Sequence, residues 1–187
     1  MALDLKRRRF TVAQYDRMAQ AGILGEDDRV ELIDGEIVEM TPIGARHATC
    51  VIRVTRLFAR TYGDIATLSP QNPIHLGRRS EPQPDVALLH QKPDDYASAI
   101  PAARDIFLVV EVAETSADPD RRVKVPLYAR AGILEVWLVD LQQQTITAYQ
   151  EPSSGGYRTV RVLRRGEQIA PAAFPDRSVA VADILPD

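Results

Sequence analysis

Apolar residues recur at helical spacing in three stretches of the chain. Residues 46–62 form the longest stretch, with apolar positions three and four residues apart, which predicts an amphipathic helix. Residues 11–21 predict a shorter helix that begins at Thr11, a residue type that caps helices well. A third helix is expected from about 118 to 131, because Gly132 follows it and glycine commonly ends helices.

Other stretches alternate between apolar and polar residues, or are apolar throughout, which is typical of strands. The segment RVELIDGEIVEM alternates on both sides of Asp34-Gly35, a pair that favours a type I′ turn because both positions need positive φ. It predicts a hairpin with strands near 29–33 and 36–40. Further strands are expected near residues 64–69, 72–76, 84–89, 106–113, 135–140, 145–150 and 157–163.

The order of these elements predicts a mixed α/β (α+β) fold. The run IFLVVEVA at 106–113 is apolar almost throughout, as expected for a strand covered on both faces. Residues 91–105 are rich in Asp and Pro and predict a surface loop with one helical turn. No repeat or long linker divides the 187 residues, so we expect a single domain over 1–187. Its core would span about 10–150, with C-terminal strands and a tail at 151–187 packed against it.

Composition excludes several classes of protein. Apolar residues make up 45% of the chain and charged residues 26%, which is ordinary for a soluble globular protein. The single cysteine, Cys50, excludes an internal disulfide and, with only three histidines present, a zinc cluster. No apolar run is long enough to span a membrane, and the N-terminus lacks the pattern of a secretory signal. We therefore expect a protein of the reducing cytoplasm, with no membrane partner.

Charge is distributed unevenly along the chain. The net charge of −3 gives no overall signature of a nucleic-acid-binding protein. Basic residues nevertheless gather in short clusters, which are most often solvated surface. These clusters lie at residues 6–9, 53–60, 78–79, 121–122 and 161–165.

Two acidic residues occupy positions where a charge is costly. Glu111 lies near the end of the most apolar predicted strand, and Asp85 directly precedes the apolar run VALLH. A buried carboxylate becomes neutral, pairs with a base or binds a cation, so Glu111 alone could simply meet an arginine. If the two strands are neighbours, both carboxylates can face one Mg²⁺, which prefers carboxylate, water and phosphate oxygens. Such a cation can polarise a phosphate and generate a hydroxide nucleophile.

Two residues of the following predicted helix are candidates to act beside these carboxylates. Lys124 can return its ammonium group to the site if the helix packs back over the strand, where it would stabilise charge on a phosphate. The alternative is an exposed surface lysine, and Pro126 predicts a kink or a restarted helix nearby. Tyr128 lies one turn further on the same face, and packing against the sheet is its expected role.

A third carboxylate and a histidine complete the set of candidates. Glu31 precedes the Asp-Gly turn and could be a third metal ligand or the partner of a basic residue, because alternation alone does not decide whether it points inward. Glu36 is a weaker candidate of the same kind. His47 could contact a phosphate or a metal-bound water, although a histidine near a helix start is more often a surface residue. His75 and His90 lack metal-ligand spacing and are expected to be structural or exposed.

Several familiar site motifs are missing from the sequence. It contains no Gly-rich phosphate loop, no GxGxxG, no GxSxG elbow, and neither CxxC nor HExxH. Cys50 falls within a predicted helix among apolar neighbours, where a thiol is usually inert. Nucleotide-cofactor, serine-hydrolase and zinc-protease chemistry therefore find no support.

Three longer motifs form a set: PQPDVALL at 82–89, LVVEVAETS at 108–116, and DRRVKVPLYARAGILEVWLVD at 120–140. The YDRM helix, the VELIDGEIVEM hairpin and the TPIGARH segment precede them in the same layout. Together they resemble the Uma-type putative restriction endonuclease family, part of the PD-(D/E)xK nuclease superfamily. The resemblance covers about residues 10–150.

The resemblance implies a restriction-endonuclease-like mixed β-sheet flanked by helices, preceded by a helix and a β-hairpin. Asp85 and Glu111 would be the Asp and Glu of the superfamily motif. The usual lysine two residues after the Glu is absent, and Lys124 matches the position on the next helix to which this family moves it. Glu31 matches the glutamate of the family's ELIDGE segment, and His47 a histidine often found after the hairpin. Dependence on Mg²⁺ or Mn²⁺ and a DNA substrate are implied as well.

The leading hypothesis from the sequence is a metal-dependent DNA endonuclease that acts as a homodimer. Its catalytic residues would be Asp85, Glu111, Lys124 and Glu31, and its three carboxylates would be the metal ligands. A second hypothesis is a non-catalytic nucleic-acid-binding or regulatory protein that keeps the nuclease fold. A third is a phosphatase-like hydrolase of small molecules that uses the same carboxylates.

Overall fold

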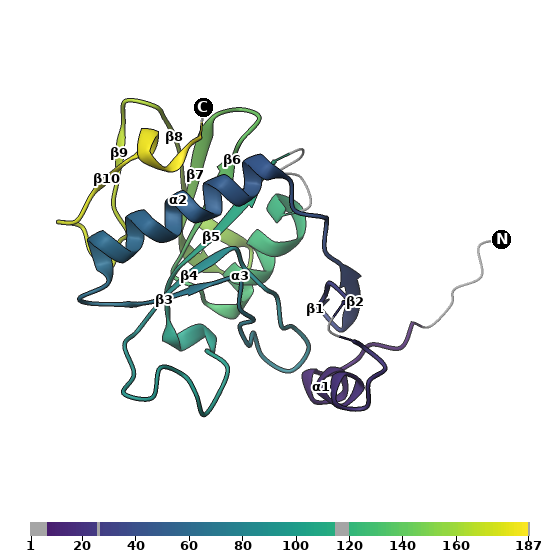
Figure 1. Cartoon of the computed structure of the whole chain (residues 1–187). Helices are drawn as coiled ribbons and strands as arrows, with labels where there is room; N and C mark the ends of the chain where they lie inside the picture. The colour runs from purple at the N-terminus through teal and green to yellow at the C-terminus, as the bar shows by residue number, and fades with distance from the viewer. Residues whose placement is uncertain (1–6, 26, 115–119, 187) are drawn as a thin grey trace.

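The computed structural model describes residues 7–25, 27–114 and 120–186, and a six-stranded mixed sheet forms its centre (Figure 1). The strands lie in the order β3-β4-β5-β6-β7-β8, and every neighbouring pair is antiparallel except β5–β6. The predicted mixed fold is confirmed. The strands are β3 (Thr67–Pro70), β4 (Val86–Leu89), β5 (Ile106–Ala113), β6 (Glu135–Asp140), β7 (Thr145–Ser153) and β8 (Gly156–Arg164).

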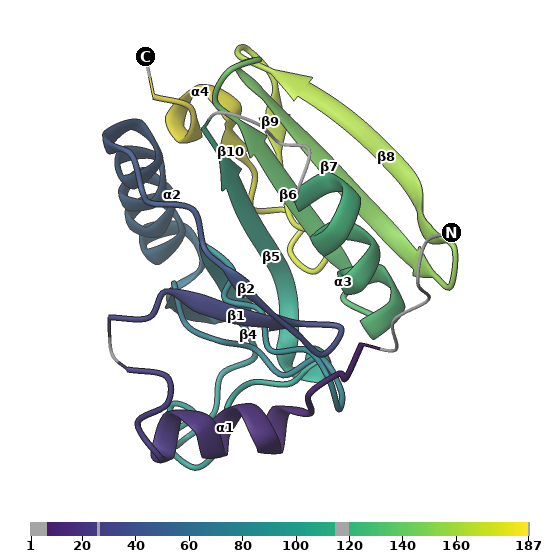
Figure 2. The same ribbon diagram turned by 90° about the vertical axis from the view of Figure 1, so that its right-hand side faces the viewer.

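Helices cover both faces of this sheet, which explains why β5 is apolar along nearly its whole length. The long helix α2 (Ala45–Tyr62) and the short helix α3 (Val125–Ala131) lie on opposite sides of it (Figure 2). On the α2 side, the ring of Phe58 packs edge-on against Trp137, with 5.7 Å between ring centroids. On the α3 side, Tyr128 belongs to the second core. Each face of the sheet therefore buries its own apolar core.

The N-terminal part contains α1 (Val12–Gln20) and a hairpin of β1 (Val30–Ile33) and β2 (Glu36–Glu39). Thr11 and Gln14 form a capping box at the start of α1, as the sequence suggests. Asp34 and Gly35 have φ of 48° and 84°, so the predicted turn with two positive φ angles is confirmed. An isolated antiparallel bridge between Leu32 and Glu81 attaches the hairpin to the loop before β4.

The connection from β5 to β6 combines two kinds of helix. A π-helical turn, η2 (Asp120–Lys124), is followed directly by α3, which carries Pro126 in its first turn and ends at Gly132 with φ 81°. Proline is tolerated in a first helical turn, since the backbone N–H there has no partner within the helix. The sequence predicted a helix over 118–131 that restarts near the proline; its first residues, 118–119, lie outside the described part of the chain.

The remaining elements pack around the edges of the sheet. They are η1 (Ala103–Asp105), β9 (Gln168–Ile169), β10 (Val179–Ala180) and α4 (Val181–Ile184). The expected packing of the tail is confirmed, because Val181, Ile184 and Leu185 are fully buried. One prediction is wrong: residues 72–76 form no strand, only an isolated bridge between His75 and Ala102. No helix among the described residues is both long and apolar enough to cross a membrane.

The strand predicted at 72–76 fails for a local reason. Gln71 has φ of 51°, which turns the chain out of the extended conformation directly after β3. Pro73 follows and has no N–H to donate to a neighbouring strand. Alternation of apolar residues here reflects burial of Ile74 and Leu76 beneath the loop rather than pairing in a sheet.

Candidate active site

A cleft of about 900 Å³ opens between the β1–β2 hairpin, the end of β5 and the π-turn η2. Its lining is strongly acidic, and only Arg9, Arg29 and Lys124 contribute fixed positive charge. Because like charges this close repel one another, such a lining needs cations or basic side chains to be stable. The acidic lining residues are Asp28, Glu31, Asp34, Glu36, Glu39, Asp85, Glu111 and Glu114.

Glu111 is the most deeply placed of these carboxylates. It belongs to β5, where residues on both sides are buried, and only 3% of its surface is exposed. Its Oε1 accepts a hydrogen bond of 2.5 Å from the hydroxyl of Tyr128, which is itself fully buried. The Nζ of Lys124 lies 3.4 Å from the same oxygen. Burial of a carboxylate is costly unless a hydrogen bond or an opposite charge offsets its lost hydration. The hydroxyl of Tyr128 in α3 and the ammonium group of Lys124 in η2 provide these two interactions.

Lys124 joins Glu111 to the N-terminal hairpin. Its Nζ lies 3.2 Å from Oε1 of Glu31, and its side chain is only 13% exposed. The other oxygen of Glu31, Oε2, accepts a hydrogen bond of 3.1 Å from the backbone N–H of Gln83. The ammonium group therefore lies between carboxylates from β1 and β5, and both oxygens of Glu31 are engaged.

Asp85 lies directly opposite Glu111 across two paired strands. Val86 pairs with Val110 in the β4–β5 ladder, so one further step along the register brings Asp85 level with Glu111. Oδ2 of Asp85 accepts a hydrogen bond of 2.8 Å from the backbone N–H of Val112. The carboxylate thus holds the end of β5 at the point where β4 begins.

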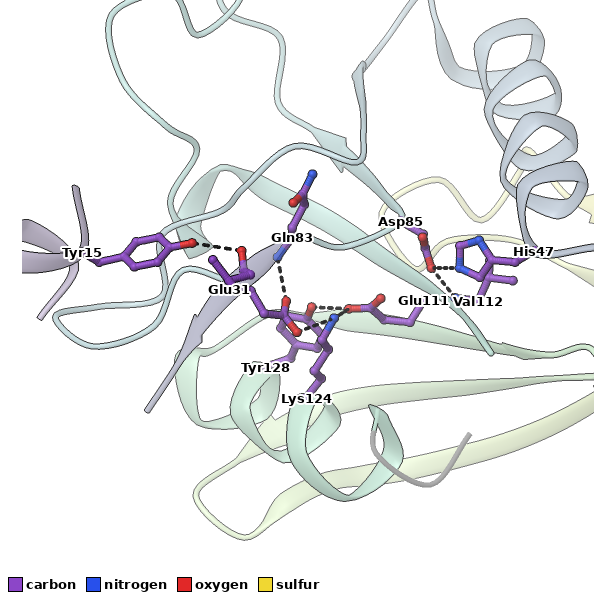
Figure 3. Close-up of polar contacts among 10 residues, drawn as sticks. Tyr15, Glu31, His47, Gln83, Asp85, Glu111, Val112, Lys124 and Tyr128 are labelled. Carbon is purple, nitrogen blue, oxygen red and sulfur yellow. Dashed lines mark hydrogen bonds and ion pairs between the residues drawn. The ribbon is translucent and has the colours of Figure 1, made fainter. Parts of the chain in front are cut away.

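His47, in the first turn of α2, contacts Asp85. Its Nε2 lies 3.1 Å from Oδ2 of Asp85, and both side chains are nearly buried. The two opposed carboxylates therefore have different neighbours. Asp85 contacts α2 through His47, whereas Glu111 contacts α3 through Tyr128 and η2 through Lys124 (Figure 3).

The residues proposed from the sequence lie around one cleft. Figure 3 shows the side chains of Glu31, Glu111 and Lys124 meeting from β1, β5 and η2. Asp85, the residue before β4, borders the same cleft but is directed to His47 and the N–H of Val112. Among the residues that the structure describes, however, no three acidic, histidine or cysteine side chains are grouped closely enough to hold a metal ion. Glu36 also lines the cleft, but it belongs to β2 and forms ion pairs with Arg7 and Arg9.

The other candidates lie outside this cleft. His75 forms an ion pair with Glu81, a buried carboxyl whose pKa is raised by desolvation and only partly lowered by that histidine. The ring of His90 lies against Phe107, with 3.8 Å between centroids. Burial raises the pKa of the Cys50 thiol to about 12, which keeps it protonated and inert as predicted.

Three residues at the site were not singled out in the sequence. Gln83 acts through its backbone N–H, which no side-chain pattern could indicate. Glu114 lies so close to Gly44, at the start of α2, that a Cβ at Gly44 would overlap its carboxylate. Its spacing of three from Glu111 was no signal, because residues three apart along a strand point to opposite faces. Tyr15 donates to the carbonyl of Val30 at 2.9 Å, and burial, then Glu81 and Glu31, raise its pKa.

Comparison with known protein families shows which family the chain belongs to. The profile described as "Uma2: Putative restriction endonuclease" matches residues 12–182, which is nearly the whole chain. The chain belongs to the Uma2 family. The match includes the hairpin, both strands that carry the opposed carboxylates, and the helix after β5. No curated protein sequence matches the chain.

A solved structure shares the fold. It is described as the crystal structure of a putative nuclease belonging to DUF820 from Anabaena variabilis. The superposition has a TM-score of 0.76 and covers 94% of this chain and 97% of that one, at 14% sequence identity. At that identity the likeness shows that the two chains share a fold. The restriction-endonuclease-like fold and the Uma-type resemblance are thereby confirmed.

Proposed function

We propose that this member of the Uma2 family is a metal-dependent endonuclease that hydrolyses phosphodiester bonds in DNA. The observation that carries the proposal is the position of Asp85 and Glu111, level with each other on paired strands and bordering one acidic cleft. Lys124 adds an ammonium group 3.4 Å from Glu111. Two carboxylates at neighbouring strands of a mixed sheet, with a lysine beside them, are the parts that the PD-(D/E)xK reaction needs.

The donor chemistry of the cleft suits Mg²⁺ or Mn²⁺. Carboxylate oxygens are the preferred protein ligands of these hard cations, and Asp85 and Glu111 would provide them. A cation bound there would polarise the scissile phosphate and lower the pKa of an attacking water. Glu31, proposed from the sequence as a third ligand, fits better as a positioning residue, because its two oxygens accept from Lys124 and Gln83.

The remaining residues hold these groups in place. The hydroxyl of Tyr128 fixes one oxygen of Glu111, and His47 together with the N–H of Val112 fixes Asp85. Lys124 is placed to donate to a phosphate oxygen as negative charge develops there. Partners of this kind orient the direct ligands and typically change activity by about 10–100-fold when they are removed.

We further propose that the active form is a homodimer. One cleft addresses one phosphodiester bond, whereas cutting both strands of a duplex needs two such clefts. Two copies related by a two-fold axis would supply them. Sedimentation of the purified protein with and without a short duplex would test this, and a monomer under both conditions would contradict it.

Cleavage of plasmid and single-stranded DNA in Mg²⁺ or Mn²⁺ tests the proposed activity. Asp85→Asn and Lys124→Ala should each reduce the rate by about 100-fold or more, since each removes a group that acts on the phosphate. Lys92→Ala is the matched control, because Lys92 pairs with Asp105 at 3.0 Å away from the cleft. Equal rates in the wild type and all three variants would refute the proposal.

One observation favours a second candidate, a DNA-binding or regulatory protein without catalysis. Lys124 already pairs with both Glu111 and Glu31, so part of the negative charge of this cluster is compensated without a cation. In that case DNA binding would fall steeply with salt and would not respond to Mg²⁺. Calorimetric titration with Mg²⁺, comparing the wild type with Asp85→Asn, separates the two: heat that disappears in the variant favours the nuclease.

A further inference from the structure

Six exposed arginines gather around the turn of the β1–β2 hairpin. They are Arg7, Arg8, Arg9, Arg78, Arg79 and Arg130, and we refer to them as the arginine surface. Backbone hydrogen bonds bring the three chain segments together: Gly35 N–H donates to the carbonyl of Arg79 at 2.7 Å, and Phe10 N–H donates to the carbonyl of Gly35 at 2.8 Å. Arg130, in the last turn of α3, reaches Oδ2 of Asp34 at 2.8 Å.

The arginine surface adjoins the acidic cleft. Asp34, at the hairpin turn, lines the cleft and also a smaller hollow of about 350 Å³ beside it. That hollow is bordered by Arg78, Arg79 and Arg130. Figure 2 shows the turn of the hairpin between the segment that precedes α1 and the lower end of α3. An extended ligand that enters the cleft therefore meets the arginines as soon as it crosses the turn.

The charges of this surface are only partly compensated. Asp34 engages Arg130, and Glu36 lies 3.4 Å from Arg9 and 3.8 Å from Arg7. The side chains of Arg78 and Arg79 form no hydrogen bond or ion pair with any residue that the structure describes. In a chain with a net charge of −3, this concentration of guanidinium groups is a strong local departure.

Guanidinium groups suit the phosphates of a nucleic-acid backbone. Arg presents planar N–H donors that match phosphate oxygens, and it loses little hydration on pairing. The acidic cleft by itself would repel a polyanion, so a nuclease acting there needs attraction from a neighbouring surface. The arginine surface can provide this attraction, because it adjoins the cleft at the hairpin turn and Arg9 lines both.

We propose that the arginine surface binds the phosphate backbone of duplex DNA beside the cleft and holds the strand for cleavage. This rests on the proposed function of the cleft, because it assigns the same ligand class to a second surface. Binding through phosphates carries no base information, so affinity should be nearly independent of DNA sequence. The arginine surface would thus supply affinity, and the cleft would supply chemistry.

A binding experiment in a non-cleaving background tests this assignment. With Glu111→Gln as the parent, affinity for two 30-bp duplexes of unrelated sequence is measured over a range of salt concentrations by fluorescence anisotropy. Arg78→Gln/Arg79→Gln should weaken binding to both duplexes by about tenfold or more at low salt. It should also reduce the slope of log affinity against log salt by about 2, one for each lost phosphate contact.

The matched control removes the same charge elsewhere. Arg56→Gln/Arg60→Gln alters two exposed arginines of α2, on the other side of the sheet, and should leave affinity and slope close to the parent values. Equal losses in the two double variants, no loss in either, or a parent that binds no duplex would overturn the proposal. Cleavage by the wild type is measured separately. A protein that binds DNA through these arginines without cutting it would refute the proposed nuclease activity and leave the proposed binding surface standing.

Discussion

Glu111 and Glu135 are buried glutamates on adjacent strands of the same sheet, yet their surroundings differ. Glu135, on β6, is 1% exposed and accepts from Trp137 Nε1 at 2.7 Å, Gln150 Nε2 at 2.9 Å and the Ala172 N–H at 2.6 Å. These donors are neutral and close the carboxyl off from solvent. Burial raises its pKa, and the three hydrogen bonds oppose that rise without cancelling it.

Glu111 differs in both partner and access. Its neighbours are an ammonium group and a phenol, and it borders a cleft rather than the packed tail. A carboxyl group enclosed by neutral donors can only stabilise the fold, whereas one that borders a cleft beside a cationic side chain can exchange that partner for a ligand. Burial of a carboxylate is therefore a poor guide to function until the kind of partner is known.

The largest effect expected from this contrast is on stability. Glu135→Ala leaves the three donors without acceptors. At about 1–3 kcal/mol for each unsatisfied buried group, we expect the free energy of unfolding to fall by at least about 3 kcal/mol. Urea unfolding monitored by Trp137 fluorescence measures it. Asp183→Ala, at an exposed carboxylate of α4, is the control and should change stability by less than about 0.5 kcal/mol. An equally small change in stability for Glu135→Ala would contradict the structural role that distinguishes Glu135 from Glu111.

The opposite pattern is expected at the cleft. Glu111→Gln keeps the acceptor for Tyr128 but removes a charge, so we expect DNA cleavage to fall by about 100-fold, or about 2.7 kcal/mol of transition-state stabilisation. Its stability should stay within about 1 kcal/mol of wild type, as measured in urea. Glu135→Gln, assayed at a temperature where it is folded, should retain cleavage within about twofold. Equal loss of cleavage in both variants would mean that activity follows stability alone.

The smallest effect is a dependence of stability on pH. Because the folded-state pKa of Glu135 is raised, its carboxyl contributes stability that is fully present below the unfolded-state pKa and is lost as pH rises through the folded-state pKa. Wild-type stability relative to Glu135→Gln, which does not titrate, should therefore decrease from about pH 4 upward and then level off. Urea titrations at a series of pH values measure this difference, and an increase with pH would contradict the raised pKa.

Local signals in the sequence were enough to predict most of the fold. The Asp34-Gly35 turn, the apolar run of β5 and the glycine after α3 each depend on the chemistry of a few neighbouring residues, and each is confirmed. The strand expected at 72–76 is wrong because alternation reports burial and does not distinguish sheet pairing from loop packing. The π-turn η2 carries no signal in composition that separates it from an ordinary helix.

The site was harder to predict because its partners come from distant segments. The sequence could nominate Glu111 and Asp85 from their positions beside apolar strands. It offered Lys124 and Glu31 as weaker candidates, which the family resemblance strengthened. It could not indicate that the N–H of Gln83 would hold Glu31, since backbone donors look alike in every sequence. Nor did it distinguish Glu135 within EVWLVD, whose neutral donors lie partly in a tail with no periodic pattern.

The contact between Lys124 and Glu31 has a consequence for how the protein matures. About half of the chain separates these residues, and the hairpin that carries Glu31 is synthesised well before η2. Glu31 and Lys124 can form their ion pair only after η2 has also been synthesised. The cleft is therefore finished only after both parts of the chain have folded together, so a partly made chain would have its carboxylates but lack the arrangement that positions its lysine.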